Sequence, residues 1–128
     1  MTGHRILVVE DNERNLKLVR DVLQYAGYDI LEARTGEQGV ELAQRSSPHL
    51  VLMDLQLPGI DGEQAFRLIR DDSRTSGIPV VALTASAMKD DRARVLRAGF
   101  DGYLEKPINV RALPAQVLAF LSREEPNR

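Results

Sequence analysis

The chain has 128 residues, of which 43% are hydrophobic and 28% charged, so it suits one globular domain and is short for two. Its net charge of −2 offers no basic surface of the kind that binds nucleic acid, and the absence of cysteine excludes disulfides, thiolate chemistry and cysteine zinc sites. No segment has the length and apolar character of a signal peptide or a membrane span, so we expect a cytoplasmic protein without membrane insertion.

The first predicted element is a buried strand over residues 6–9, an unbroken apolar run that ends in acidic residues. An amphipathic helix follows, which Asp11 or Asn12 can cap. Gly27 ends this helix, because glycine adopts the left-handed conformation of a helix C-terminus at little cost. Residues 28–33 form a second strand, whose charged residues favour an edge of the sheet.

The second helix is predicted to start at a capping box of Thr35 and Gln38 and to end near residues 46–48. It leads into a third strand over residues 50–54, which is apolar except for its last residue, Asp54. A short apolar run of this kind is typical of a strand in a parallel sheet that is covered on both faces.

A turn at Pro58 and Gly59 separates Asp54 from a third helix, which Asp61 and Gln64 are predicted to cap. The buried stripe of this helix is expected to consist of Ala65, Leu68 and Ile69.

The last part of the chain contains a fourth strand over residues 79–84, a charged helix that Gly99 ends, and a short fifth strand over residues 102–105. We expect one domain over residues 1–124 and a polar tail over residues 125–128.

Pro114 lies about one turn into the last predicted helix, residues 110–122. If Asn109 caps this helix, Pro114 lacks the N–H that should reach the carbonyl of Val110, and its ring crowds that carbonyl. We therefore expect a distorted first turn, or a helix that begins at Leu113 or Pro114.

Five strands that alternate with five helices indicate an α/β fold with a parallel sheet and helices on both faces. We expect a doubly wound, flavodoxin-like fold whose five parallel strands have the order 2-1-3-4-5. Periodicity does not determine strand order, so this expectation rests on the resemblance described below.

Polar side chains end several of these strands. Glu10 and Asp11 follow the first strand, Asp54 ends the third, Thr84 ends the fourth and Lys106 follows the fifth. The carboxyl ends of parallel strands meet at one edge of the sheet, where ligands bind in open α/β folds. Three crowded carboxylates repel one another, and a hard cation such as Mg²⁺ relieves the repulsion.

This combination favours a phosphoryl-transfer site in which Asp54 is the nucleophile and forms an aspartyl phosphate. Taken singly, each residue also has a structural interpretation. Glu10 and Asp11 can cap a helix, and Thr84 and Lys106 can be ordinary strand ends. Their common place at one edge of the sheet favours a shared function.

The chain resembles the receiver domains of two-component response regulators, which belong to the CheY-like superfamily. The motifs that carry the resemblance are Val9-Glu10-Asp11-Asn12, Met53-Asp54 with Asp61-Gly62, Thr84-Ala85 and Lys106-Pro107. Residues 83–91 and 98–108 are similar to DivK-type single-domain regulators and to the receivers of hybrid histidine kinases. The resemblance covers nearly the whole chain.

The resemblance implies a role for individual residues. Asp54 matches the phosphoacceptor, and Glu10 and Asp11 match the acidic pair that holds Mg²⁺. Asp54 and the backbone carbonyl of Gln56 would complete the protein ligands of the metal.

Other matches concern the phosphate and the switch. Lys106 matches the lysine that pairs with the phosphoryl group, and Thr84 matches the switch hydroxyl. Tyr103 matches the aromatic residue that turns inward when Thr84 engages the phosphate. A cis peptide bond before Pro107 is also implied.

By the same resemblance, the chain accepts a phosphoryl group from a phosphohistidine of a histidine kinase or a histidine phosphotransfer protein. It would assist its own phosphorylation and dephosphorylation without being an enzyme for an external substrate. The signal would reach a downstream protein through the face formed by the fourth helix, fifth strand and fifth helix.

Three alternatives remain. A phosphohydrolase of the haloacid-dehalogenase type needs an Asp-x-Asp motif, whereas Gln56 lies two residues after Asp54. A flavin carrier of the same topology needs a phosphate loop rich in Ser, Thr and Gly after the first strand, where this chain is acidic. A receiver cut from a hybrid kinase would have the same chemistry, although the initial Met1 favours a complete protein.

The remaining candidates are interpreted as residues of the core or of a solvated surface. They are His4, His49, Met53, Met88, Arg92, Arg94 and Arg97.

Overall fold

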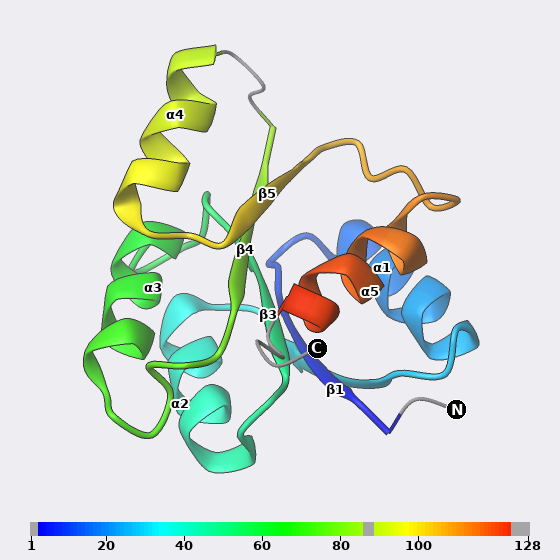
Figure 1. The fold of residues 1–128 in the computed structure, drawn as a ribbon, viewed down its shortest axis with the longest axis horizontal. Helices are drawn as coiled ribbons and strands as arrows, with labels where there is room; N and C mark the ends of the chain where they lie inside the picture. The colour runs from blue at the N-terminus through cyan, green and yellow to red at the C-terminus, as the bar shows by residue number, and fades with distance from the viewer. Residues whose placement is uncertain (1–2, 86–88, 124–128) are drawn as a thin grey trace.

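The computed structural model describes residues 3–85 and 89–123 (Figure 1). Its strands are β1 (Arg5–Val9), β2 (Asp29–Ala33), β3 (Leu50–Asp54), β4 (Val80–Thr84) and β5 (Gly102–Glu105). Its helices are α1 (Glu13–Tyr25), α2 (Gly36–Ser46), α3 (Gly62–Asp71), α4 (Lys89–Ala98) and α5 (Leu113–Arg123). Among the described residues, no helix has the length and apolar character needed to cross a membrane.

The strands form one parallel sheet in the order β2-β1-β3-β4-β5. This confirms the doubly wound, flavodoxin-like order that the resemblance implied. β2 lies at an edge, and only its last residue, Ala33, is buried, in agreement with the charges in its sequence. β3 and β4 are buried along their whole length, which explains their nearly continuous apolar sequences.

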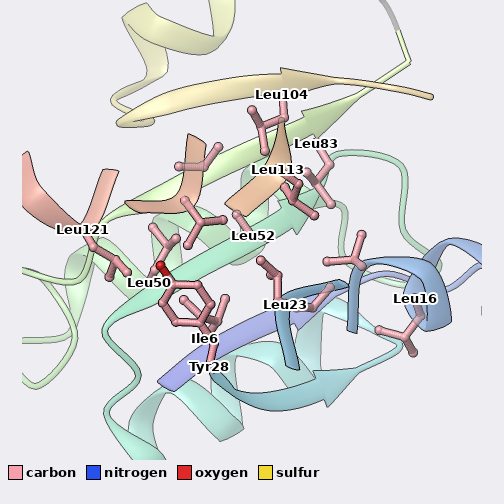
Figure 2. Close-up of a cluster of buried hydrophobic side chains, with 14 residues drawn as sticks. Ile6, Leu16, Leu23, Tyr28, Leu50, Leu52, Leu83, Leu104, Leu113 and Leu121 are labelled. Atoms are coloured by element: carbon pink, nitrogen blue, oxygen red, sulfur yellow. The ribbon is translucent and has the colours of Figure 1, made fainter. Parts of the chain in front are cut away.

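The helices form two layers (Figure 1): α1 and α5 cover one face of the sheet, and α2, α3 and α4 cover the other. Side chains alternate across a strand, so β1 contributes Ile6 and Val8 to the first face and Leu7 and Val9 to the second. Figure 2 shows the first cluster, in which leucines of α1 and α5 meet leucines of β3, β4 and β5. Two buried layers therefore hold the sheet rigidly below its carboxyl edge.

Helix starts follow the predicted side chains closely at two places. Asn12 caps α1, and its side chain accepts a hydrogen bond from the backbone N–H of Asn15 at 2.9 Å. Asp61 and Gln64 form a complete capping box at α3. Gly27 has a φ of 102° just after α1, which confirms the expected left-handed residue at the end of that helix.

The capping box predicted at α2 is only half correct. The hydroxyl of Thr35 accepts a hydrogen bond from the backbone N–H of Gln38 at 3.1 Å, as predicted. The Gln38 side chain, however, accepts from the N–H of Arg34 at 2.7 Å rather than from that of Thr35. The long glutamine side chain reaches one residue further back, so the reciprocal bond of a capping box is not formed.

The predicted buried stripe of α3 is wrong at one position. Leu68 is 48% exposed, whereas its neighbour Phe66 is buried at 2% exposure. Phe66 stacks on Phe100, which lies two residues beyond the end of α4, with ring centroids 4.1 Å apart. Helical spacing permits either residue next to Ala65 and Ile69, and the packing of two distant phenylalanines decides between them.

The start of α5 agrees with the expected effect of Pro114. The helix begins at Leu113, so Pro114 lies in the first turn, where a helix needs no backbone donor. Asn109 begins the preceding turn, and its side-chain oxygen accepts from the N–H groups of Arg111 at 3.1 Å and Ala112 at 3.2 Å.

Candidate functional site

An acidic cluster lies at the carboxyl ends of β1 and β3, which are neighbours in the sheet. The register pairs Val9 with Met53, so Glu10 and Asp54 follow side by side. Single oxygens of Glu10, Asp11 and Asp54 lie within 4.8 Å of one another. Glu10 is 1% exposed and Asp54 is 4% exposed, whereas Asp11 is open to solvent. The structure thus brings together the three carboxylates that were expected at this edge.

Lys106 supplies positive charge to this cluster. Its backbone N–H donates to the carbonyl of Thr84 at 2.8 Å, which anchors the residue just beyond β5 at the same edge. Its ammonium donates to Asp54 Oδ2 at 3.0 Å and lies 2.8 Å from Glu10 Oε1. With Asp11, three carboxylates and one ammonium leave the cluster with excess negative charge.

Burial and crowding change the proton affinity of two of these groups. Burial raises the pKa of the Glu10 carboxyl above its ordinary value, and the neighbouring Asp54 raises it further. Burial alone would lower the pKa of the Lys106 ammonium, but its contacts with Glu10 and Asp54 outweigh burial, and the pKa lies above its ordinary value. The cluster is therefore one in which additional positive charge is favourable.

This arrangement predicts a pH dependence of stability that Glu10 causes. Glu10 has its ordinary pKa of 4.5 in the unfolded chain and a higher pKa in the folded chain. In EDTA, the free energy of unfolding should therefore fall as the pH rises from 4.5 through the higher pKa. Between these two values the folded chain holds a proton that the unfolded chain has lost, so a rise in pH favours unfolding. Urea unfolding of the unchanged chain and of Glu10→Gln, from pH 4.5 to neutrality, measures this component. Parallel pH profiles of the two proteins would contradict it.

The donor atoms fit Mg²⁺, which prefers oxygen ligands and keeps several waters. Glu10 Oε1 lies 2.8 Å from the Lys106 ammonium and accepts no other hydrogen bond among the described residues, so this oxygen retains a second lone pair for a cation. Asp11 connects the cluster to solvent, where the remaining ligand waters would lie. Within residues 3–85 and 89–123, Glu10, Asp11 and Asp54 are the one group of three or more side chains with this ligand geometry.

The loop after Asp54 is tied closely to the end of β3. The backbone N–H of Gln56 donates to Asp54 Oδ1 at 3.0 Å, and the N–H of Gly62 donates to the carbonyl of Leu55 at 3.2 Å. A Cβ at Gly62 would overlap the carbonyl oxygen of Asp54 and lie 2.7 Å from Leu55 Cα. This overlap explains why α3 starts with a glycine, and the sequence motif alone does not reveal that explanation.

Thr84 and Tyr103 occupy different positions relative to the cluster. Thr84 is 8% exposed at the end of β4, on the same edge as Asp54. Tyr103 is half-buried, and its hydroxyl accepts a hydrogen bond from Arg92 of α4 at 3.4 Å. Arg92 is exposed, as its sequence had suggested, and it also makes this contact with β5.

A cavity of about 380 Å³ opens beside Asp54 and Lys106, between the start of α3 and α4. Its apolar lining includes Val95, Ala98 and Phe100, and its charged lining includes Asp61, Glu63, Asp91 and Arg94. Thr84 also lines it, whereas Tyr103 is absent from its described walls.

An ion pair in the wall of this cavity was not expected. Arg94 Nη2 donates to Glu63 Oε1 at 3.0 Å and thereby links α4 to α3. Sequence reasoning interpreted Arg94 as solvated and did not consider Glu63. No sequence signal pairs residues on two separate helices, because their distance depends on how the helices pack.

The other candidate residues are structural. His4 and His49 come together edge to face, with ring centroids 5.0 Å apart, at the start of β1 and β3 and away from the acidic cluster. Met53 is fully buried in the core, and Met88 lies outside the described residues. The peptide bond before Pro107 is cis.

Comparisons with known proteins agree with this geometry. The sequence profile of the response regulator receiver domain matches residues 6–118. The polar-differentiation response regulator DivK of Brucella ovis is 39% identical over 116 residues, which cover 91% of this chain and 94% of the relative.

Solved structures show the same fold. The receiver domain of sensor histidine kinase PA1611 from Pseudomonas aeruginosa PAO1, with a magnesium ion coordinated in its active site cleft, has a TM-score of 0.86 and 36% identity. The similarity covers 94% of this chain and 99% of that one. A CheY-like response regulator receiver domain protein from Methanospirillum hungatei JF-1 has a TM-score of 0.86 and 26% identity, over 99% of this chain and 100% of that one.

Proposed function

The chain belongs to the response regulator receiver domain family of two-component signalling, and on that premise we propose that Asp54 is the residue that accepts the phosphoryl group. One observation supports this choice above others: Asp54 is a nearly buried carboxylate that lies against Lys106 and shares an oxygen cluster with Glu10 and Asp11. A carboxylate in such a setting has both a charge partner and a place for a cation.

In the proposed reaction, a carboxylate oxygen of Asp54 attacks the phosphorus of a phosphohistidine. A P–O bond forms, the P–N bond breaks, and the electron pair of the broken bond leaves with the imidazole nitrogen. In the reverse switch, water attacks the phosphorus, and the acyl phosphate releases inorganic phosphate and the Asp54 carboxylate. The chain acts on its own side chain, so we assign it no external substrate.

Lys106 and Thr84 are proposed to hold the phosphoryl oxygens. The Lys106 ammonium, 3.0 Å from Asp54 Oδ2, is close enough to pair with an oxygen of the transferring group and to offset its charge. Thr84 lines the cavity next to Asp54, and its hydroxyl can donate to another phosphoryl oxygen.

Glu10, Asp11 and Asp54 are proposed to hold Mg²⁺, together with the backbone carbonyl of Gln56. The geometry of the three carboxylates supports this assignment, as does the excess negative charge around Lys106. When bound, the ion offsets negative charge on the phosphoryl oxygens.

The switch is proposed to run from Thr84 to Tyr103 and on to a downstream protein at the α4–β5–α5 face. Tyr103 lies on β5 and contacts α4 through Arg92, so a change in its position would alter that face. The proposed phosphate donor is a histidine kinase or a histidine phosphotransfer protein, and the proposed place of the exchange is the cytoplasm.

Mass spectrometry of the intact chain tests the proposal. After incubation with acetyl phosphate and Mg²⁺, we expect a gain of one phosphoryl group, which EDTA prevents. Reduction of the acyl phosphate with borohydride, followed by peptide mapping, should place the label at Asp54. A label at another residue, or no gain under any condition, would overturn the assignment.

A further inference from the structure

α4 has little apolar attachment to the rest of the molecule. Among its described side chains only Val95 is buried, whereas α1, α2 and α3 each bury several residues. Polar contacts supply other links: Arg92 donates to the Tyr103 hydroxyl of β5, and Arg94 donates to Glu63 of α3. The position of α4 therefore depends on contacts that single substitutions can remove.

The Arg94–Glu63 pair connects two parts of the site across one cavity. Glu63 is the second residue of α3, directly after Gly62, and Gly62 contacts the backbone of Asp54 and Leu55. We therefore expect a displacement of Glu63 to reach the end of β3 through Gly62. Arg94 lies on the helix that follows β4, the strand that ends at the Thr84 hydroxyl.

We propose that Arg94 and Glu63 are positioning residues that hold α4 in place and thereby slow the phosphorylation of Asp54, a role that rests on the proposed function. Their ion pair holds α4 to the start of α3 in the arrangement described here. The cavity of about 380 Å³ beneath them, next to Asp54, gives α4 room to move. The pair thus opposes any displacement of α4 that accompanies phosphorylation.

The expected size of the effect follows from the exposure of the pair. The Arg94 side chain is 70% exposed and that of Glu63 is 27% exposed. Solvent screens such a pair, so its loss shifts an equilibrium by about two- to fivefold. Because the pair favours the arrangement without phosphate, its removal should accelerate phosphorylation by that factor.

Four variants test this proposal: Arg94→Gln, Glu63→Gln, both changes together, and Arg97→Gln. Arg97 is a matched control, because it is an exposed arginine of the same helix with no hydrogen bond or ion pair among the described residues. The rate of phosphorylation by acetyl phosphate should rise about two- to fivefold in each single variant of the pair. The double variant should match the single variants, because one pair is broken only once.

Hydrogen exchange in the absence of any phosphate donor gives a second readout. The backbone amides of residues 95–98 should exchange faster in Arg94→Gln and Glu63→Gln than in Arg97→Gln, while those of α1 remain unchanged. The negative charge of Glu63 also stabilises the start of α3, so Glu63→Gln has a second effect that is unrelated to Arg94. The proposal is therefore judged on the effect that Arg94→Gln and Glu63→Gln have in common.

Two kinds of failure can be told apart. If the unchanged chain is phosphorylated, but the variants of the pair behave like Arg97→Gln or their effects add in the double variant, the positioning role is overturned alone. If the unchanged chain takes no phosphate, the proposed function fails and this role fails with it.

Discussion

In the Asp54→Asn variant we expect acetyl phosphate to add no phosphoryl group at all. An amide oxygen is a far poorer nucleophile toward phosphorus than a carboxylate, and it cannot form the acyl phosphate. The asparagine keeps an oxygen that can accept the Gln56 N–H, so the loop after β3 stays in place. Intact mass measured over time, with and without Mg²⁺, checks this result. A label on the variant would mean that another residue is the acceptor.

The same variant should be at least as stable as the unchanged chain in EDTA. Asp54 raises the pKa of Glu10, a sign that their carboxylates repel each other. The substitution removes this repulsion, while Lys106 keeps its contact with Glu10 at 2.8 Å. We expect a gain in the free energy of unfolding of up to about 1 kcal/mol.

Urea unfolding in EDTA measures this difference. A loss of about 2 kcal/mol or more would show that the contact between Lys106 and Asp54 outweighs the repulsion among the carboxylates. With Mg²⁺ present the order should reverse, because a cation that binds only the folded chain stabilises the protein with more ligands to a greater extent.

Replacement of Gly62 by alanine should lower the free energy of unfolding by about 2–4 kcal/mol. The new methyl group would overlap the carbonyl oxygen of Asp54 and lie 2.7 Å from Leu55 Cα. Both are backbone atoms of β3 and of the loop after it, so no rotamer change can relieve the overlap. α3 has to move away from β3, and its capping box has to move with it.

A matched control for this change is Gly77→Ala. A Cβ at Gly77 meets nothing within 4 Å, so alanine there should leave stability unchanged or raise it by up to about 1 kcal/mol. Urea unfolding of the two variants gives the comparison, and equal stabilities would contradict the overlap at Gly62.

Gly62→Ala should also slow phosphorylation by about tenfold or more, because a small misplacement of reacting groups has a large effect on rate. The displaced loop carries Gln56, whose N–H donates to Asp54 Oδ1. The rate with acetyl phosphate, measured where the variant remains folded, checks this result. An unchanged rate would show that the loop and the acceptor move independently.

Local signals in the sequence predicted much of the fold. The apolar runs of β3 and β4, the cap at Asn12 and the left-handed Gly27 all reflect interactions within a few residues. Pro114 moved the start of α5 to Leu113, because a missing N–H and a crowded ring act on the same turn of the chain. Such effects need no knowledge of the rest of the molecule.

The errors concern contacts between distant elements. Helical spacing placed Leu68 in the core, but Phe66 is the residue that packs, since Phe100 comes to lie 4.1 Å from it. The interpretation of Arg94 as part of a solvated face agrees with its 70% exposure, but it missed the partner Glu63, which lies on another helix. In both cases the deciding partner is far away in the sequence, and periodicity carries no information about it.

By itself, the sequence determined the succession of strands and helices along the chain, the family and the residue types at the strand ends, because each depends on local patterns or on motifs. The tertiary structure alone decided the distances: the 3.0 Å between Lys106 and Asp54, the close approach of Gly62 to the end of β3, and the pair that joins α3 to α4. These distances arise when the parallel sheet brings the carboxyl ends of its strands to one edge and the helices pack around them. Packing of this kind depends on the whole chain at once.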